Sequence, residues 1–311
     1  NMDMYQKRKA RQEMKANETK EEAKSNININ WYPGHMAKAK REITEILPLV
    51  DIVLELRDAR IPFSSKNPMI DDILKNKPRL ILLNKATLAD PRDTKAWIEA
   101  LTKDSTYALD IDSISGYNMK QIQPFIKKIL APKLEAYAKK GLVNKSLRAL
   151  VVGIPNVGKS TFINFMAKKK VAKTGDKPGV TKTQTWLKIS DSLQFLDTPG
   201  ILWPKFESQD VGIKLSICGS IKDEIVDLHM VALYALNIIE HKYPTLLEQR
   251  YGISIDDFND DSDGMKVASL IAAKRGCLLK GNQYDYERVF TLVMNDIRSN
   301  RIGAMTFESA N

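Results

Sequence analysis

The chain has 311 residues, 43% of them hydrophobic and 28% charged, which excludes a disordered or collagen-like chain and leaves room for roughly two domains. Its 48 Lys and Arg against 38 Asp and Glu give a net charge of +10. This excess favours a polyanionic partner such as nucleic acid, although solubility alone explains it equally well.

Features of the sequence predict a cytoplasmic protein without a membrane segment. Cys218 and Cys277 lack zinc-site and disulfide spacing, so we expect a reducing compartment. The most apolar segment, 225–239, is interrupted by Asp227 and His229, which indicates a buried helix rather than a membrane span. Residues 1–28 mix both charge signs without the apolar stretch of a signal peptide, and we expect a mobile, charged N-terminal arm.

From Ile29 onward, apolar runs of strand length alternate with segments of helical spacing. Strands are predicted at 50–56, 79–84, 105–111 and 147–154, followed by a hairpin at 184–189 and 193–197. Helices are predicted at 68–75, 94–103, 119–140 and 159–168, with Pro124 and Pro132 starting, kinking or dividing the third. This alternation predicts an α/β fold with a mostly parallel sheet covered on both faces.

After Pro204 the sequence predicts only helices, at 221–240, 243–251, 264–275 and 284–299. We therefore expect an α/β domain at 29–206 and a smaller all-α domain at 207–311.

The run GIPNVGKST (153–161) satisfies the phosphate-loop pattern G-x-x-x-x-G-K-[ST] between a predicted strand and a predicted helix. Its glycines let the backbone curl so that successive N–H groups face phosphate oxygens. The lysine reaches the terminal phosphates, and the serine hydroxyl completes a Mg²⁺ shell. The predicted nucleotide-binding residues here are Asn156, Val157, Gly158, Lys159, Ser160 and Thr161, with Lys159 also acting in catalysis.

A second motif, DTPG (197–200), follows a predicted strand some forty residues later. Asp197 is placed to hold Mg²⁺ through water, and the Gly200 N–H is available to the γ-phosphate. Thr181, in the loop between the two motifs, is the candidate for a second Mg²⁺ hydroxyl that orders when γ-phosphate is bound. Ile201 stands where GTPases usually carry the glutamine that orients the attacking water.

The base-recognition motifs precede the phosphate loop. NKAT (84–87) ends a predicted strand, and DSISGYN (112–118) follows the next one. They correspond to the N-K-x-D motif that reads guanine and to the Ser-Ala-like loop that accompanies it. The order of base, phosphate and switch motifs indicates a circularly permuted P-loop GTPase. The predicted base-site residues are Asn84, Lys85, Thr87 and Ser113.

These motifs, with NWYPGHMAKAKREI (30–43), LRDARIPFSSKNPMI (56–70), KPGVTK (177–182) and LDTPGILWPKF (196–206), resemble those of the ribosome biogenesis GTPase A family. The resemblance covers about 29–206 and, more loosely, the helical end through GAMTFES (303–309). It implies a GTPase that binds a late precursor of the large ribosomal subunit, through rRNA and ribosomal proteins, and assists its maturation while hydrolysing GTP to GDP and phosphate. The basic balance and the helical C-terminal domain are consistent with RNA binding, and we expect a monomer.

One residue departs from the family pattern: where the family has the aspartate that binds the guanine base, this chain has Thr87. A carboxylate accepts two hydrogen bonds from guanine, whereas a hydroxyl makes one weaker contact. Asp90 lies three residues too far along to be taken as its equivalent. Guanine remains the preferred base, and Thr87→Asp is expected to tighten GTP binding.

The family's candidate for positioning the attacking water is the histidine of PGHM, here His35. Imidazole can exchange hydrogen bonds with water and titrates near neutrality. The alternative is that His35 caps its helix or contacts rRNA. Asn156 resembles the asparagine of GTPases activated by K⁺, although it also fits a role in stabilising the loop.

Two other functions compete with this assignment. A metabolic P-loop phosphotransferase would need an acceptor-substrate site, and no such constellation is evident. A non-hydrolysing RNA-binding protein is favoured by Thr87 and Ile201, whereas the intact Lys159, Ser160, Asp197 and Thr181 argue against it.

Overall fold

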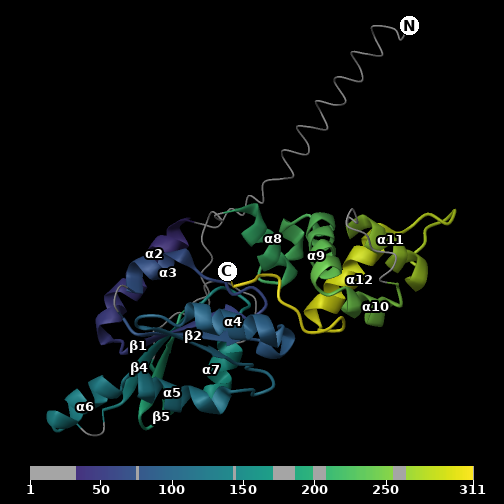
Figure 1. Cartoon of the computed structure of the whole chain (residues 1–311). Coiled ribbons are helices and arrows are strands. Elements are labelled where there is room, and N and C mark those ends of the chain that lie inside the picture. The colour runs from purple at the N-terminus through teal and green to yellow at the C-terminus, as the bar shows by residue number, and fades with distance from the viewer. Residues whose placement is uncertain are drawn as a thin grey trace.

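The computed structural model describes residues 33–74, 77–142, 145–170, 186–198, 208–254 and 264–310, with only the backbone described at 33–39 and 69. A six-stranded sheet with helices on both faces lies beside a group of helices, as Figure 1 shows. The expected arm at 1–28 lies outside the described residues. In the described part, no helix combines the length and apolarity needed to cross a membrane.

The sheet has the order β3-β2-β1-β4-β6-β5. All neighbouring pairs are parallel except β5–β6, which form an antiparallel edge. The mostly parallel sheet expected from the sequence is therefore confirmed. The strands are β1 (Ile52–Asp58), β2 (Arg79–Asn84), β3 (Thr106–Asp110), β4 (Leu147–Gly153), β5 (Trp186–Ser190) and β6 (Leu193–Asp197).

Apolar side chains alternate between the two faces of the sheet and are covered on each. On one face, Val53 and Leu150 pack with residues of α2 (Pro33–Ile46) and α3 (Pro68–Leu74), and Ile81 packs with Trp97 of α4 (Pro91–Leu101). On the other face, Leu54 and Val151 pack with residues of α5 (Ile122–Ile129) and α7 (Lys159–Ala167). This burial fixes the register, because a slip of one residue would exchange the faces.

Proline accounts for one helix start that differs from the sequence prediction and for the expected division of another helix. α4 begins three residues earlier than expected, since the Asp90 side chain accepts from the Arg92 N–H and Pro91 fills the first position. The predicted helix 119–140 divides into α5 and α6 (Ala131–Lys139) around Leu130, just before Pro132.

The named elements of the second domain are all helices among its described residues, as expected, but the first of them was not predicted. α8 (Gln209–Ile217) begins at Ser208, whose hydroxyl accepts from the Val211 N–H. Six of its nine residues are buried, so it lacks the one-sided apolar stripe that marks a surface helix. The predicted helix 221–240 begins later, since Asp227 caps α9 (Leu228–Lys242). The remaining helices, α10 (Pro244–Tyr251), α11 (Gly264–Arg275) and α12 (Tyr286–Arg298), lie close to their predicted positions.

The last ten described residues, 301–310, leave the helical domain and pack on the sheet domain. The Met305 N–H donates to the Leu88 carbonyl (3.0 Å), and the Phe307 N–H donates to the Arg60 carbonyl (2.9 Å). The Glu308 carboxylate accepts from the Phe63 N–H at 2.7 Å. In Figure 1 this yellow segment runs back toward α4 and ends near the middle of the molecule. The two domains are therefore joined by an extended segment as well as by the chain before α8.

Candidate functional site

The phosphate loop connects β4 to α7, at the edge where the parallel strands end. Gly158 has φ +100°, and a Cβ there would lie 2.4 Å from Nδ2 of Asn84. Glycine is required by the backbone conformation and by the close approach of the base loop. Ser160 and Thr161 follow in the first turn of α7, whose N-terminal N–H groups favour an anion.

Lys159 and Asp197 face each other across the end of the sheet. The Lys159 side chain is buried, which lowers its pKa to about 8, and the Asp197 carboxylate opposes that shift. Burial likewise raises the pKa of Asp197, against the effects of Lys159 and of the Thr198 N–H. Each charge is thus unfavourable in the free protein and would be stabilised by a ligand of the opposite sign.

A magnesium ion fits this arrangement. Oδ1 of Asp197 is buried without a hydrogen-bond partner among the described residues, and Ser160 lies in the first turn of α7, directly after Lys159. A carboxylate oxygen and a serine hydroxyl are ligands that Mg²⁺ accepts together with water and phosphate oxygens. The other predicted ligand, Thr181, lies outside the described residues.

The base loop is hydrogen-bonded to the phosphate loop. Nδ2 of Asn84 donates to the Val157 carbonyl (2.8 Å), and Oδ1 of Asn84 accepts from the Ser113 N–H and hydroxyl (3.0 and 2.9 Å). The Lys85 ammonium donates to the Asn156 carbonyl (3.0 Å). The structure therefore brings together residues from three loops that are up to 73 positions apart in sequence.

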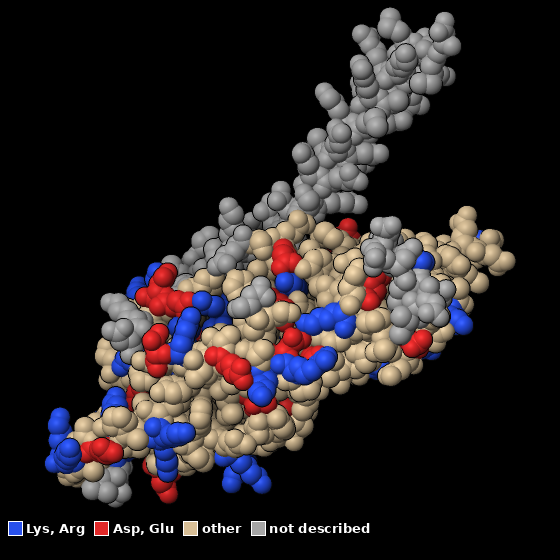
Figure 2. Space-filling model, in the orientation of Figure 1, with Lys and Arg blue, Asp and Glu red and all other residues tan. Residues whose placement is uncertain are grey.

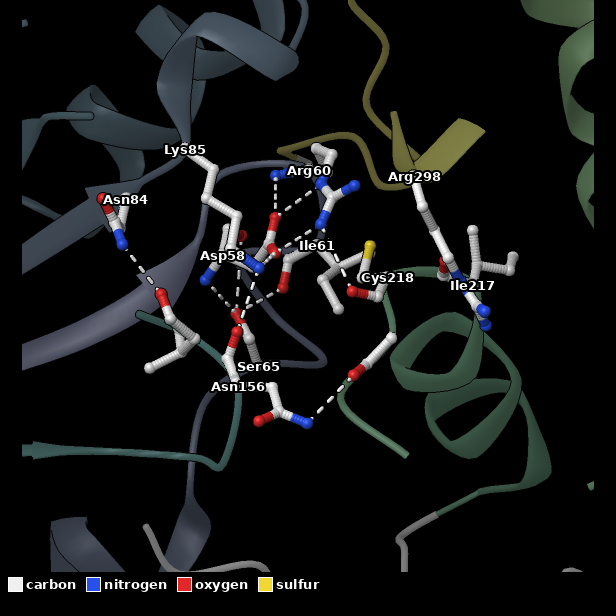
Figure 3. A network of polar contacts seen from close by, with 12 residues as sticks. Asp58, Arg60, Ile61, Ser65, Asn84, Lys85, Asn156, Ile217, Cys218 and Arg298 are labelled. Atoms are coloured by element: carbon white, nitrogen blue, oxygen red, sulfur yellow. Dashed lines mark hydrogen bonds and ion pairs between the residues drawn. The ribbon is translucent and has the colours of Figure 1, made fainter. Parts of the chain in front are cut away.

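Behind this junction lies a buried ion cluster that sequence analysis did not single out. Asp58 accepts two hydrogen bonds from the Arg60 guanidinium (2.9 and 2.7 Å) and pairs with Lys85 at 3.0 Å, as Figure 3 shows. Burial raises the pKa of Asp58, but the two cations outweigh it and hold the pKa well below its usual range. Arg60 also donates to the Cys218 carbonyl (3.4 Å) after α8. The cluster thus links the base-loop lysine to the helical domain.

Removing the central carboxylate should destabilise the protein strongly. Asp58→Ala leaves the buried Arg60 guanidinium without its charge partner, which typically costs about 3–5 kcal/mol. We expect a large drop in melting temperature. The matched control is Lys188→Ala, which breaks an exposed pair with Asp191 and should leave the melting temperature nearly unchanged. Equal melting temperatures for the two variants would contradict this account of the cluster.

Asn156 also connects the two domains. It adopts the left-handed region (φ +59°), and its Nδ2 donates to the Gly219 carbonyl at 3.2 Å. Figure 3 shows this contact reaching from the phosphate loop to the end of α8. With the amide nitrogen held there, the amide oxygen is the atom left for a cation.

Three predicted residues cannot be placed in this site. Thr181 and Gly200, with Ile201, lie outside the described residues. His35 is the third residue of α2, and only its backbone is described. Thr87 lies in the base loop, where its hydroxyl donates to Oδ2 of Asp112. Asp112 was not predicted as a site residue, although it directly precedes Ser113 in the quoted motif.

A phosphate loop on β4, a base loop on β2 that precedes it in sequence, and a carboxylate on β6 together define a P-loop GTPase with permuted motif order. The chain matches the profile of a family described as "50S ribosome-binding GTPase" over residues 148–253. The chain belongs to the ribosome biogenesis GTPase A family. It is 50% identical over 283 residues to Ribosome biogenesis GTPase A of Bacillus licheniformis, covering 90% of this chain and 98% of that one.

Two more distant proteins agree with this membership. Mitochondrial ribosome-associated GTPase 1 of Xenopus tropicalis is 35% identical over 233 residues, covering 72% of this chain and 74% of that one. The crystal structure of GNP-bound YlqF from T. maritima superposes with a TM-score of 0.58 at 29% identity, covering 88% of this chain and 99% of that one. The fold class, the family and the GTPase activity expected from the sequence are confirmed, in preference to the metabolic phosphotransferase and the non-hydrolysing protein.

Proposed function

We propose that this GTPase binds a late precursor of the large ribosomal subunit and hydrolyses GTP there to assist assembly. The observation that carries the proposal is the preformed nucleotide site, in which Asn84, Lys85 and Ser113 are already joined to the phosphate loop. Relatives named for ribosome biogenesis and ribosome association match nearly the whole or most of the chain. The partner comprises rRNA and ribosomal proteins, and the protein acts as a cytoplasmic monomer.

Different residues of the chain bind the base, the phosphates and the magnesium ion. Asn84 and the aliphatic stem of Lys85 pack the base, while the phosphate-loop N–H groups and Lys159 bind the phosphates. Gly200 contributes an N–H to the γ-phosphate. Ser160, Thr181 and Asp197 hold Mg²⁺, which neutralises charge on the β- and γ-phosphate oxygens when bound.

Two groups complete the hydrolytic site. His35 positions the attacking water, since Ile201 has no group that can do so. The amide oxygen of Asn156 holds K⁺, the proposed activating ion, near the phosphates. Nδ2 of the same side chain donates to the Gly219 carbonyl of the helical domain. A change in the conformation of the phosphate loop therefore alters this contact with the helical domain.

Charge favours the GTPase half as the main RNA-binding part. Residues 207–311 carry 11 Lys and Arg against 16 Asp and Glu, whereas residues 29–206 carry 30 against 17. The C-terminal domain expected to bind RNA is thus net acidic, which counts against a broad phosphate-binding surface on it. On the face shown in Figure 2, both signs are interspersed over the GTPase domain, and Lys and Arg gather at the lower left, over α6.

Binding to large-subunit particles should weaken steeply with salt, because contacts to phosphates release counterions. Lys40 and Arg41 are exposed on α2. Replacing either with alanine should weaken binding and lower the slope of log K against log salt by about 1. The matched control is Lys274→Ala on α11, an exposed lysine of the acidic domain. Binding to the particles is measured by co-sedimentation. Binding that does not depend on salt, or no binding in the GTP state, would count against the proposal.

A further inference from the structure

The base site carries Thr87 in place of the usual aspartate, and the structure shows a carboxylate from another loop in contact with Thr87. The Thr87 side chain is exposed, and its hydroxyl donates to Oδ2 of Asp112. Asp112 itself is only 5% exposed and lies directly before Ser113, which holds Asn84. The two residues are 25 positions apart and meet where the base loop and the Ser-Ala-like loop run side by side.

We infer that Thr87 and Asp112 form a guanine-reading pair, in which Asp112 fixes the hydroxyl of Thr87 as a hydrogen-bond acceptor. The inference rests on the GTPase function but not on ribosome binding. Thr87 contacts the base, and Asp112 acts through it as a positioning residue.

The chemistry follows from what each group can donate. A free hydroxyl has one proton and two acceptor lone pairs, so by itself it can face either a donor or an acceptor. An ionised carboxylate can only accept. Since the Thr87 proton is given to Oδ2 of Asp112, the threonine oxygen presents lone pairs to the ligand. Guanine offers N1–H and N2–H donors there, whereas adenine offers the N1 lone pair, which the oxygen repels.

The remaining contacts of Asp112 leave Oδ2 for this task. Oδ1 accepts from the Ile114 N–H (2.8 Å) and the Ser115 N–H (3.1 Å), which fixes the turn of the loop. Among the described residues, no Lys or Arg forms an ion pair with Asp112, whereas Lys85 is paired with Asp58. The negative charge of Asp112 therefore polarises the Thr87 hydroxyl rather than being neutralised by a nearby cation.

This arrangement changes the expected effect of Thr87→Asp. Alone, that substitution would bring a second carboxylate against Asp112, and like charges in contact are unfavourable. It should improve guanine binding only together with Asp112→Asn, which removes the opposing charge. The double variant then carries the single base-reading carboxylate of the family pattern.

The decisive substitution is Asp112→Asn, because it changes one atom. Its amide oxygen can keep the two bonds to Ile114 and Ser115, while the amide nitrogen now donates to Thr87 and turns the hydroxyl proton outward. Thr87→Val is the matched partner variant, since it removes the hydroxyl and keeps the shape. The readout is the ratio of dissociation constants for GDP and ADP, measured on the full-length protein without ribosomes.

We expect the wild-type protein to prefer GDP and each single variant to lower that preference by about tenfold or more. The variant carrying both changes should lose no more than the worse single variant, because both remove the same interaction. Thr87→Asp in the Asp112→Asn background should restore the preference for GDP.

Several results would overturn the inference. One is an unchanged GDP-to-ADP ratio in Asp112→Asn, including the case in which both nucleotides weaken equally because only the loop is disturbed. Another is that the two single effects multiply in the combined variant. If Asp112→Asn does not fold, Thr87→Val provides the test. An unchanged GDP-to-ADP ratio in that variant overturns the inference of a guanine-reading pair. A wild-type protein that binds neither nucleotide would count against the proposed function, whereas GDP binding with an unchanged ratio counts only against the pair.

Discussion

Replacing Lys159 with alanine is expected to weaken GDP and GTP binding by on the order of 100-fold or more while the protein stays folded. The ammonium is buried at the start of α7 next to Asp197, and charge-assisted contacts to phosphate oxygens are lost with it. Burial lowers the pKa of Lys159 to about 8, so this charge does not stabilise the free protein at neutral pH. The melting temperature without nucleotide should therefore not fall.

Nucleotide titration and thermal unfolding measured together test this expectation. Lys127→Ala is the control, because Lys127 is exposed on α5 and should affect neither quantity. Unchanged GTP affinity and turnover in Lys159→Ala would remove the phosphate loop from the site and with it the whole assignment.

Replacing His35 with alanine should lower ribosome-stimulated GTP hydrolysis by roughly 10²–10⁴-fold, the range typical of a lost proton-transfer or water-positioning group. Nucleotide affinity should survive, because the proposed contact is with water and not with phosphate. His241→Ala is a matched control, since that histidine is exposed on α9 and bonds only within its own helix among the described contacts. Ile201→Ala should also change hydrolysis little.

Single-turnover hydrolysis with and without large-subunit particles, in K⁺ and in Na⁺, separates the contributions. Stimulation that requires K⁺ agrees with a cation held by Asn156. A His35→Ala protein that binds the particle and hydrolyses GTP at the normal stimulated rate would show that another group holds the water.

Local signals were sufficient for most of the fold. Strands β1 to β4 could be predicted because each is a short, nearly continuous apolar run, which buried parallel strands require, whereas β5 and β6 were predicted as a hairpin. The phosphate loop and the base loop could be predicted because their residues recur at fixed spacing. Glycine is needed for the backbone conformation, lysine for its charge and asparagine for its hydrogen bonds. The permuted order of these motifs followed from reading them along the chain.

Long-range contacts account for what the sequence did not reveal. Asp58 is a site residue because its carboxylate meets Lys85, and Asp112 is one because it meets Thr87. Neither contact leaves a periodic pattern, since each pairs residues from different loops. The segment 301–310 likewise reads as the end of the helical domain, yet the N–H groups of Met305 and Phe307 donate to Leu88 and Arg60 of the GTPase domain.

The position of α8 was missed for a related reason. Its residues Val211, Ile213, Leu215 and Ile217 alternate as in a strand, and all are buried because other helices and the GTPase domain surround them. A helix buried on most sides carries no helical stripe in its sequence. By contrast, α12 has a clear apolar face, and both of its ends were predicted to within two residues.

The most direct test of the central claim is the rate of GTP hydrolysis by the purified protein with and without large-subunit precursor particles. We expect slow turnover alone and a marked increase with the particles, in K⁺ more than in Na⁺, and in the wild-type protein but not in Lys159→Ala. A rate that is the same with and without particles, for a protein that binds GTP normally, would contradict the proposal that this GTPase acts on the large ribosomal subunit.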